Sequence, residues 1–151
     1  TNIGGTSADM GNAVFVAAML ELPTMAFFSK MSEKINCGTL IKFSILMFCV
    51  IHSLTYFATN MIMIYLAQVC QMFAYALFIP ASVYYVNEKI ALADRVKGQS
   101  LVTTSMTLSG VFANFAGGIM LDALGVGHVL LAGIILSIVG AVIVILTTEK
   151  V

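Results

Sequence analysis

Charged side chains are scarce in this sequence. Aspartate, glutamate, lysine and arginine together make up 9% of the 151 residues, whereas apolar residues make up 60% and mean hydropathy is +1.03. Soluble domains contain about 25% charged and about 45–50% apolar residues. A water-soluble fold could not bury this much apolar surface, so the composition excludes an ordinary soluble domain.

Motifs that carry chemistry are also missing. Cys37, Cys49 and Cys70 form no Cys-x-x-Cys pattern and no paired spacing, so we interpret them as packing residues and expect neither a disulfide nor a metal site. The sequence contains no paired acidic motif, no metal-ligand spacing and no glycine-rich phosphate loop. We therefore expect no cofactor, no nucleic-acid partner and no enzymatic activity, and a membrane-embedded enzyme stays open only as an alternative.

Long apolar stretches occupy most of the chain. A bilayer core of roughly 30 Å requires about 20 apolar residues per helix, and each stretch has about that length or slightly more. We predict an all-α integral membrane protein with five transmembrane helices and no soluble domain. The predicted spans are about 10–30, 40–59, 61–86, 100–123 and 128–147.

The basic residues fall on alternate connections between these spans. They lie around the first connection, in the third connection and after the last span: Lys30, Lys34, Lys42, Lys89, Arg95, Lys97 and Lys150. Because cytoplasmic connections are enriched in Lys and Arg, we expect a multi-pass protein of the plasma (cytoplasmic) membrane. The N-terminus of this segment should lie outside and the C-terminus in the cytoplasm.

The start of the chain reads as a loop without the charged region of a secretory signal. Together with an odd number of spans, this predicts a piece of a larger protein.

Small residues recur every four positions in the last two predicted spans. This spacing lets helix backbones approach closely in lipid, so we expect both stripes to pack against neighbouring helices. The first stripe is Ser109, Ala113 and Gly117, and the second is Gly133, Ser137 and Ala141.

Glu21 lies near the middle of the first predicted span. An ionisable group at that depth costs about 2.5 kcal/mol or more unless it faces protein or water. It suits reversible protonation or a hydrogen bond to a polar solute, and the alternative is a protonated carboxyl held by a neighbouring helix. Pro23 removes a backbone donor two residues later and should kink this helix near the site.

Other polar groups also lie inside predicted spans. Gln68 and Gln71 are three residues apart, and Tyr75 and Ser82 extend the same helical face, which should point into the bundle or an aqueous cavity. This face should bind sugar or nucleoside hydroxyls or bond to other helices, and Pro80 should bend the span below it.

Two further polar side chains, His52 and Asn114, could contact cargo in the second and fourth spans. His52 could also relay a proton, or it could be a satisfied structural group.

In order and spacing, these features resemble the C-terminal half of the major facilitator superfamily. Glu21 and Pro23 precede a basic connection, residues 29–38, which is similar to a degenerate form of the family's cytoplasmic Gly/Asp-Arg/Gly-Arg loop. Residues 88–100 resemble the entry to the family's eleventh helix, and Gly117-Gly118-Ile-Met-Leu-Asp122-Ala-Leu-Gly125 resembles the end of that helix. The resemblance covers essentially the whole chain and implies helices eight to twelve of a six-plus-six fold.

Within the superfamily, the chain resembles most the lactose-permease-like, oligosaccharide:proton symporter branch. That branch has an essential glutamate in its eighth helix, which Glu21 matches. Its tenth helix carries a Lys-x-x-His-Met-Phe-Glu pattern, where this sequence reads Gln68-Val-Cys-Gln71-Met-Phe-Ala. The ninth-helix arginine of the branch falls one position from His52. The charged groups of the tenth helix are replaced, so any proton coupling must depend on Glu21 or on the N-terminal half.

The resemblance implies a secondary active transporter of a small polar solute, such as a sugar or a nucleoside, driven by proton symport through alternating access. Its partners would be the solute, protons, the lipid bilayer and the missing N-terminal half of the same transporter. The alternatives are an efflux pump for amphipathic compounds, to which the ten methionines could adapt, and a non-transporting membrane scaffold subunit.

Overall fold

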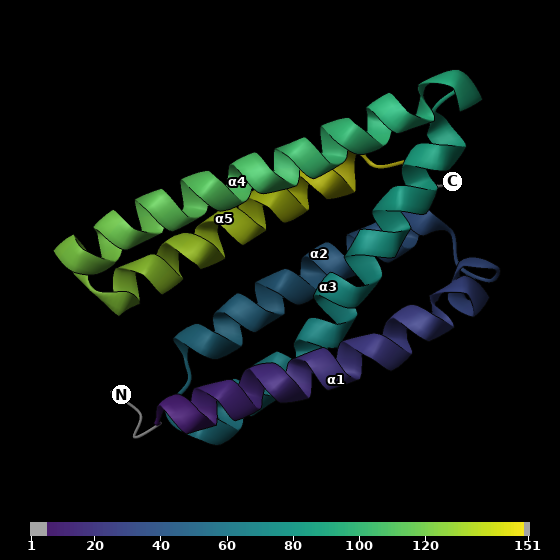
Figure 1. Cartoon of the computed structure of the whole chain (residues 1–151). Helices are drawn as coiled ribbons and strands as arrows, with labels where there is room; N and C mark the ends of the chain where they lie inside the picture. Colours follow the sequence, from purple (N-terminus) through teal and green to yellow (C-terminus); the bar gives the residue numbers. More distant parts are fainter. Residues whose placement is uncertain (1–5, 150–151) are drawn as a thin grey trace.

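The computed structural model describes residues 6–149 and consists of five long helices. They are α1 (Ser7–Ser32), α2 (Cys37–Tyr56), α3 (Met61–Lys89), α4 (Arg95–Leu124) and α5 (Val126–Thr147), with a short 3-10 turn, η1 (Leu92–Asp94), before α4. All five are long and apolar enough to cross a membrane. The predicted all-α membrane fold is confirmed (Figure 1).

Local capping sets where the helices begin. The Thr6 side chain accepts from the Asp9 backbone N–H while Asp9 accepts from the Thr6 backbone N–H, which forms a capping box. Asn36 and Asn60 cap α2 and α3 through the backbone N–H groups of Thr39 and Met63. Such caps satisfy helix-end donors that have no partner within the helix.

Gly125 separates α4 from α5. Its φ of +81° lies in a region that side chains disfavour, and α5 runs back alongside α4 from this point (Figure 1).

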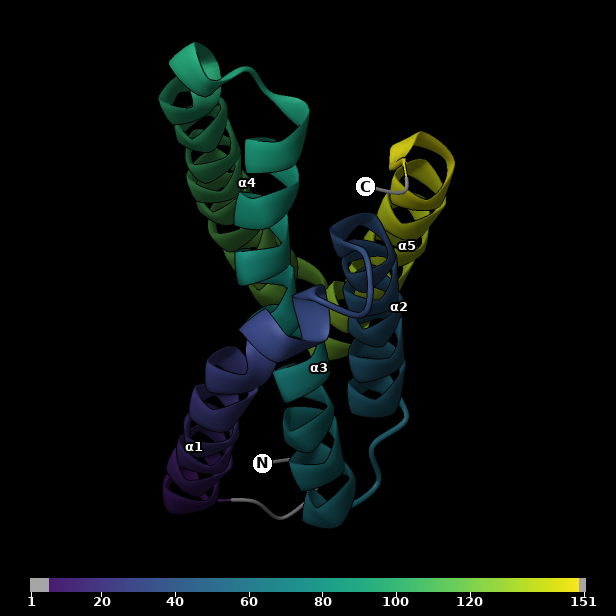
Figure 2. The same ribbon diagram turned by 90° about the vertical axis from the view of Figure 1, so that its right-hand side faces the viewer.

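Helix α3 lies at the centre of the bundle and packs against both α1 and α2, while α5 packs on the other side of α2. Ala67, Ala74 and Ala81 of α3 are almost fully buried, and these small side chains allow close helix approach. Figure 2 shows α1 and α5 on opposite sides of the α2–α3 pair.

The helices continue through both prolines. Pro23 lies inside α1 and Pro80 inside α3, and neither ends its helix. Each proline removes one donor from the backbone ladder. Near Pro23, the Thr24 hydroxyl donates to the Leu20 carbonyl at 3.0 Å.

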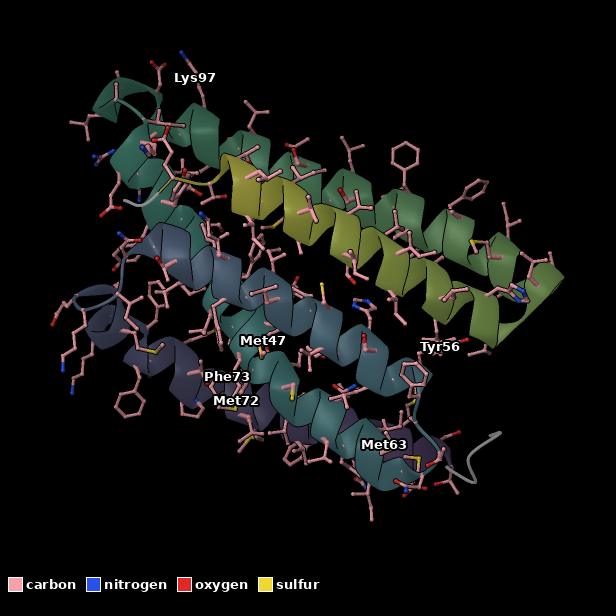
Figure 3. All side chains as sticks on the ribbon, turned by 180° about the vertical axis from the view of Figure 1, so that it is seen from behind. Met47, Tyr56, Met63, Met72, Phe73 and Lys97 are labelled. Atoms are coloured by element: carbon pink, nitrogen blue, oxygen red, sulfur yellow. The ribbon has the colours of Figure 1, made fainter. Side chains whose placement is uncertain are left out.

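Contacts between α1 and α3 show that these helices run in the same direction. The Tyr65 hydroxyl donates to the Asp9 carbonyl at 3.4 Å near their starts. The rings of Phe28 and Tyr84 meet edge to face near their ends. The connections after α1 and after α3 therefore lie at the same end of the bundle, where Lys97 projects from the start of α4 (Figure 3). Tyr56 and Met63 lie at the opposite end.

The segment after α5 is held against α2 and α3 by four residues that we call the C-terminal clasp: Gly38, Tyr85, Lys89 and Glu149. Glu149 forms an ion pair with Lys89, and its backbone N–H donates to the Tyr85 hydroxyl at 3.3 Å. A Cβ at position 38 would collide with the Glu149 carbonyl oxygen, so the approach requires glycine. The hydrogen bond from Lys89 and its charge lower the pKa of the Glu149 carboxyl.

The two small-residue stripes have different outcomes. On α5, Ala141 is buried, and Gly133 lies against the His52 ring, as expected for packing. On α4, Ser109 and Ala113 are exposed, and a Cβ at Gly117 would meet nothing within 4 Å among the described residues. The packing predicted for the α4 stripe is therefore wrong within residues 6–149. Gly98, near the start of α4, is the residue of this helix that is buried, against Val86 of α3 and Ile90, which follows α3.

Candidate functional site

The polar face predicted on α3 is present on a continuous helix. On an ideal helix, Gln68, Gln71 and Tyr75 fall within about 60° of one another. Both glutamines are half-buried, and Tyr75 is 46% exposed. Ser82 differs, because it is buried and its hydroxyl donates to the Ile79 carbonyl at 2.7 Å. The face available to a solute is therefore formed by the glutamines and Tyr75.

Glu21 lies on α1 at the level of this face. In both contacts between α1 and α3, the α3 residue lies 56 positions after its α1 partner. The same interval places Glu21 level with Leu77, within one turn of Tyr75. The Glu21 side chain is half-buried and has no hydrogen-bond partner among residues 6–149. The structure brings this carboxyl to the depth of the polar face without joining the two through a hydrogen bond.

His52 has two protein contacts that do not involve this face. Its Nδ1 lies 2.7 Å from the Phe48 carbonyl, and since a carbonyl can only accept, Nδ1 carries the proton. The ring also packs on α5, where a Cβ at Gly133 would lie 3.0 Å from Cδ2. These contacts give His52 a packing role between α2 and α5.

Asn114 is exposed on α4 and is not brought to the polar face of α3. Its Nδ2 donates to the Gly110 carbonyl one turn earlier on the same helix, at 2.8 Å. Within residues 6–149, the Oδ1 of the amide accepts no hydrogen bond.

A groove of about 570 Å³ lies where α2, α3 and α4 meet. Tyr75 links it to the predicted polar face. The groove is mostly apolar, with three aromatic rings and two serine hydroxyls, and is lined by Phe48, Tyr75, Phe78, Ile79, Leu101, Val102, Ser105, Met106 and Ser109. The sequence patterns did not predict this groove. The available signal was Ser105 and Ser109, one turn apart on an apolar helix.

A second groove, of about 480 Å³, lies at the basic end between α3 and α4. It is lined by Asn87, Arg95, Val96, Gln99, Ser100, Thr103 and Thr104. Gln99 Nε2 donates to the Val83 carbonyl at 2.9 Å and ties the two helices together. The Nε of Arg95 is enclosed and has no hydrogen-bond partner within residues 6–149. The hydrogen bond from Gln99 to Val83 packs the start of α4 against the end of α3.

Among residues 6–149, no cluster of three or more His, Cys, Asp or Glu side chains could hold a metal ion. Cys37, Cys49 and Cys70 are free thiols, and Cys37 is buried in the core with Phe28 and Leu40. The features that remain are an intramembrane carboxylate, a glutamine–tyrosine face and an aromatic groove.

A comparison with known protein families identifies the family of this chain. Residues 1–151 match the family described as Major Facilitator Superfamily. The chain belongs to the major facilitator superfamily. No curated protein and no solved structure matches the chain.

Membership defines the general activity. Major facilitator proteins are membrane transporters and not enzymes, so this chain is a multi-pass membrane protein of a transporter family. In this superfamily, substrate sites lie near the middle of the membrane, where helices from the repeats meet. Glu21, Gln71 and Tyr75 lie in the central parts of α1 and α3.

Proposed function

We propose that this major facilitator protein is a secondary active transporter that moves a small polar solute, such as a sugar or a nucleoside, by proton symport and alternating access. The chain would form helices eight to twelve, in the C-terminal half. The motif order from Glu21 through the connection at residues 29–38 to Gly125 supports this placement. The clustering of the basic connections at one end of the bundle supports a cytoplasmic location for that end.

The observation that carries the proposal is the position of Glu21. A carboxyl group in the middle of an apolar helix is costly unless it serves a purpose or has a partner. Here it is half-buried, lies at the level of Tyr75 and has no hydrogen-bond partner among the described residues. A scaffold helix would gain nothing from such a group.

The chemistry of the Glu21 carboxyl group suits coupling of solute transport to proton movement. Protonated Glu21 is neutral and can donate to a solute, and it crosses between access states at lower electrostatic cost than a carboxylate. The solute and the proton would bind together from outside. After the inward transition, the solute and the proton would be released, and the empty site would return with Glu21 as a carboxylate. Gln68 and Gln71 supply amide donors and acceptors for the hydroxyls of the solute.

Uptake by the full-length protein in sealed liposomes tests the proposal. An inward proton gradient should drive accumulation of a labelled sugar or nucleoside, and Glu21→Gln should abolish that accumulation. Exchange of labelled for unlabelled solute should persist, because exchange need not release the proton. Glu33→Gln is the matched control, since Glu33 is exposed in the connection after α1. Unchanged accumulation in Glu21→Gln would make Glu21 a structural residue and remove the basis of the proposal.

A further inference from the structure

We infer that the solute site extends into the groove between α2, α3 and α4, and that the transported solute carries a planar aromatic ring, as a nucleoside does and a simple sugar does not. This inference rests on the proposed transport function and selects among its substrates. Three observations carry it: the arrangement of the aromatic rings, the exposed serine hydroxyls of the groove and its position beside the glutamines.

The aromatic rings are arranged to receive another ring. Phe48 meets Tyr75 and Phe78 edge to face, with ring centroids 6.3 Å apart in both pairs. Edge-to-face and offset contacts are the preferred geometries of aromatic groups. The volume of about 570 Å³ lies within the range of roughly 300–1,000 Å³ that is typical of small-molecule sites.

The groove contains two serine hydroxyls, from Ser105 and Ser109. Some hydroxyls in the spans donate to a backbone carbonyl one turn earlier, as Ser44 does to Leu40 at 2.9 Å and Thr107 does to Thr103 at 3.0 Å. Ser105 and Ser109 make no such bond within residues 6–149, although both lie on the same helix as Thr107. Both serines are exposed on α4, so their hydroxyls are open to a ligand in the groove. These groups therefore favour a ligand that combines a ring with hydrogen-bonding atoms.

The position of the groove beside the glutamines indicates which part of the solute each side chain would contact. Gln71 lies one turn, about 6 Å, from Tyr75 along α3, and Gln68 lies nearly a turn further in the same direction. A solute with its ring beside Phe48 and Phe78 would place its hydroxylated part near Gln71. A nucleoside has these two parts at about this separation, and a hexose has only the second.

Uptake by the full-length protein in liposomes, with a radiolabelled purine nucleoside and a radiolabelled hexose, tests the inference. Phe48→Leu and Phe78→Leu keep apolar volume but remove a ring from the groove. Each should raise the apparent KM for the nucleoside by about two- to tenfold, with kcat little changed. Ser105→Ala with Ser109→Ala should raise the KM in the same direction.

Phe43→Leu and Phe73→Leu are the matched controls. These two rings also meet edge to face between α2 and α3, with centroids 6.4 Å apart, but neither lines the groove. Both controls should keep the KM of the original protein. Equal KM changes in the groove and control variants would overturn the groove as a solute site.

Three other outcomes are decisive. If hexose uptake is saturable while the nucleoside is neither transported nor inhibitory, the inference is overturned and the proposed function stands. No saturable uptake of either solute would overturn the proposed function and the inference together. A photoactivatable lipid in the bilayer could crosslink to Phe78→Cys. If the nucleoside does not displace it, the groove holds an acyl chain, which also overturns the inference.

Discussion

At the scale of single residues, the polar groups of the spans differ in whether the protein already satisfies them. His52, Ser82 and Asn114 each bond to a carbonyl of their own helix. Glu21, Gln68 and Gln71 have no side-chain hydrogen bond within residues 6–149. Because a buried polar group costs free energy without a partner, the second set is the one available to a solute, a proton or another part of the transporter.

Gln71→Ala should weaken solute binding more than Cys70→Ala does. The two positions are neighbours on α3, but they point about 100° apart on an ideal helix, and only position 71 shares a face with Tyr75. The loss of one neutral hydrogen bond costs about 0.5–1.5 kcal/mol, which corresponds to a two- to tenfold rise in apparent KM. The measurement is the concentration dependence of uptake, and equal effects at both positions would assign the solute to a different face.

Gly133→Val should destabilise the protein, because a side chain at position 133 would meet the His52 ring. The neighbouring Cβ contact would be only 3.0 Å, and overpacking of a fitted contact costs about 1–3 kcal/mol. Gly140→Val is the control, since a Cβ at that position meets nothing within 4 Å among the described residues. Thermal unfolding in detergent measures the difference, and an equal midpoint for both variants would show that His52 moves aside freely.

At the scale of helices and connections, the C-terminal clasp joins three elements that are distant in sequence. Tyr85 and Lys89 come from the end of α3, Gly38 from the start of α2 and Glu149 from the segment after α5. The clasp closes the basic end of the bundle around the core formed by Phe28, Leu40 and Leu77. It fixes the end of α3, the helix that carries the glutamine face.

Lys89→Glu should lower the thermal unfolding midpoint, and adding Glu149→Lys should recover part of the loss by restoring an ion pair of opposite polarity. The ion pair holds the pKa of the Glu149 carboxyl below its usual value. Its stabilising effect is therefore present above the ordinary glutamate pKa and is lost as pH falls through the lowered value. Unfolding midpoints measured from neutral pH into the acid range should show the Lys89→Glu effect at neutral pH and its loss in acid.

Gly38→Ala provides an independent test of the same clasp. The added Cβ would collide with the backbone of Glu149, so it should weaken the clasp at every pH. A Gly38→Ala variant as stable as the original protein would show that the segment after α5 does not need to approach α2.

At the scale of the whole molecule, the helices are unevenly packed. α1, α2 and α3 share the core, whereas α4 exposes large apolar side chains such as Phe112 and Phe115, at 69% and 71%. Figures 1 and 2 show α4 and α5 joined at one end and lying on the far side of the bundle from α1. Such exposed apolar surface in a membrane protein is covered by lipid or by other helices.

Labelling of engineered cysteines in sealed cells should show one orientation. In a background without the three native cysteines, Thr59→Cys and Gly127→Cys should react with an impermeant reagent added outside. Glu33→Cys and Ala93→Cys should react only after the membrane is opened, because the basic residues gather at their end of the bundle. The opposite pattern would place the basic connections outside and overturn the proposed topology.

Much of the fold was predictable because it depends on local sequence. The apolar stretches, the Asn36 and Asn60 caps and the glycine at position 125 act within one or two helical turns. Each observed helix overlaps one predicted span, although the bounds differ: α2, for example, begins at Cys37 and ends at Tyr56, where the prediction was about 40–59. The fourth helix begins at Arg95 and not near position 100, because its polar first turn still forms backbone hydrogen bonds. The α3 face was predictable for a similar reason, since helical periodicity alone aligns Gln68, Gln71 and Tyr75.

The sequence by itself therefore determined the number and length of the helices, the ends at which basic residues gather and the polar positions inside the spans. The tertiary structure alone decided which faces meet. It turned His52 toward Gly133, set Glu21 level with Leu77, left the α4 stripe uncovered and joined Phe48 to Ser105 and Ser109 in one groove. The physical reason is that a helix's rotation and neighbours depend on the fit between side chains distant in sequence, whereas its existence depends on residues a few positions apart.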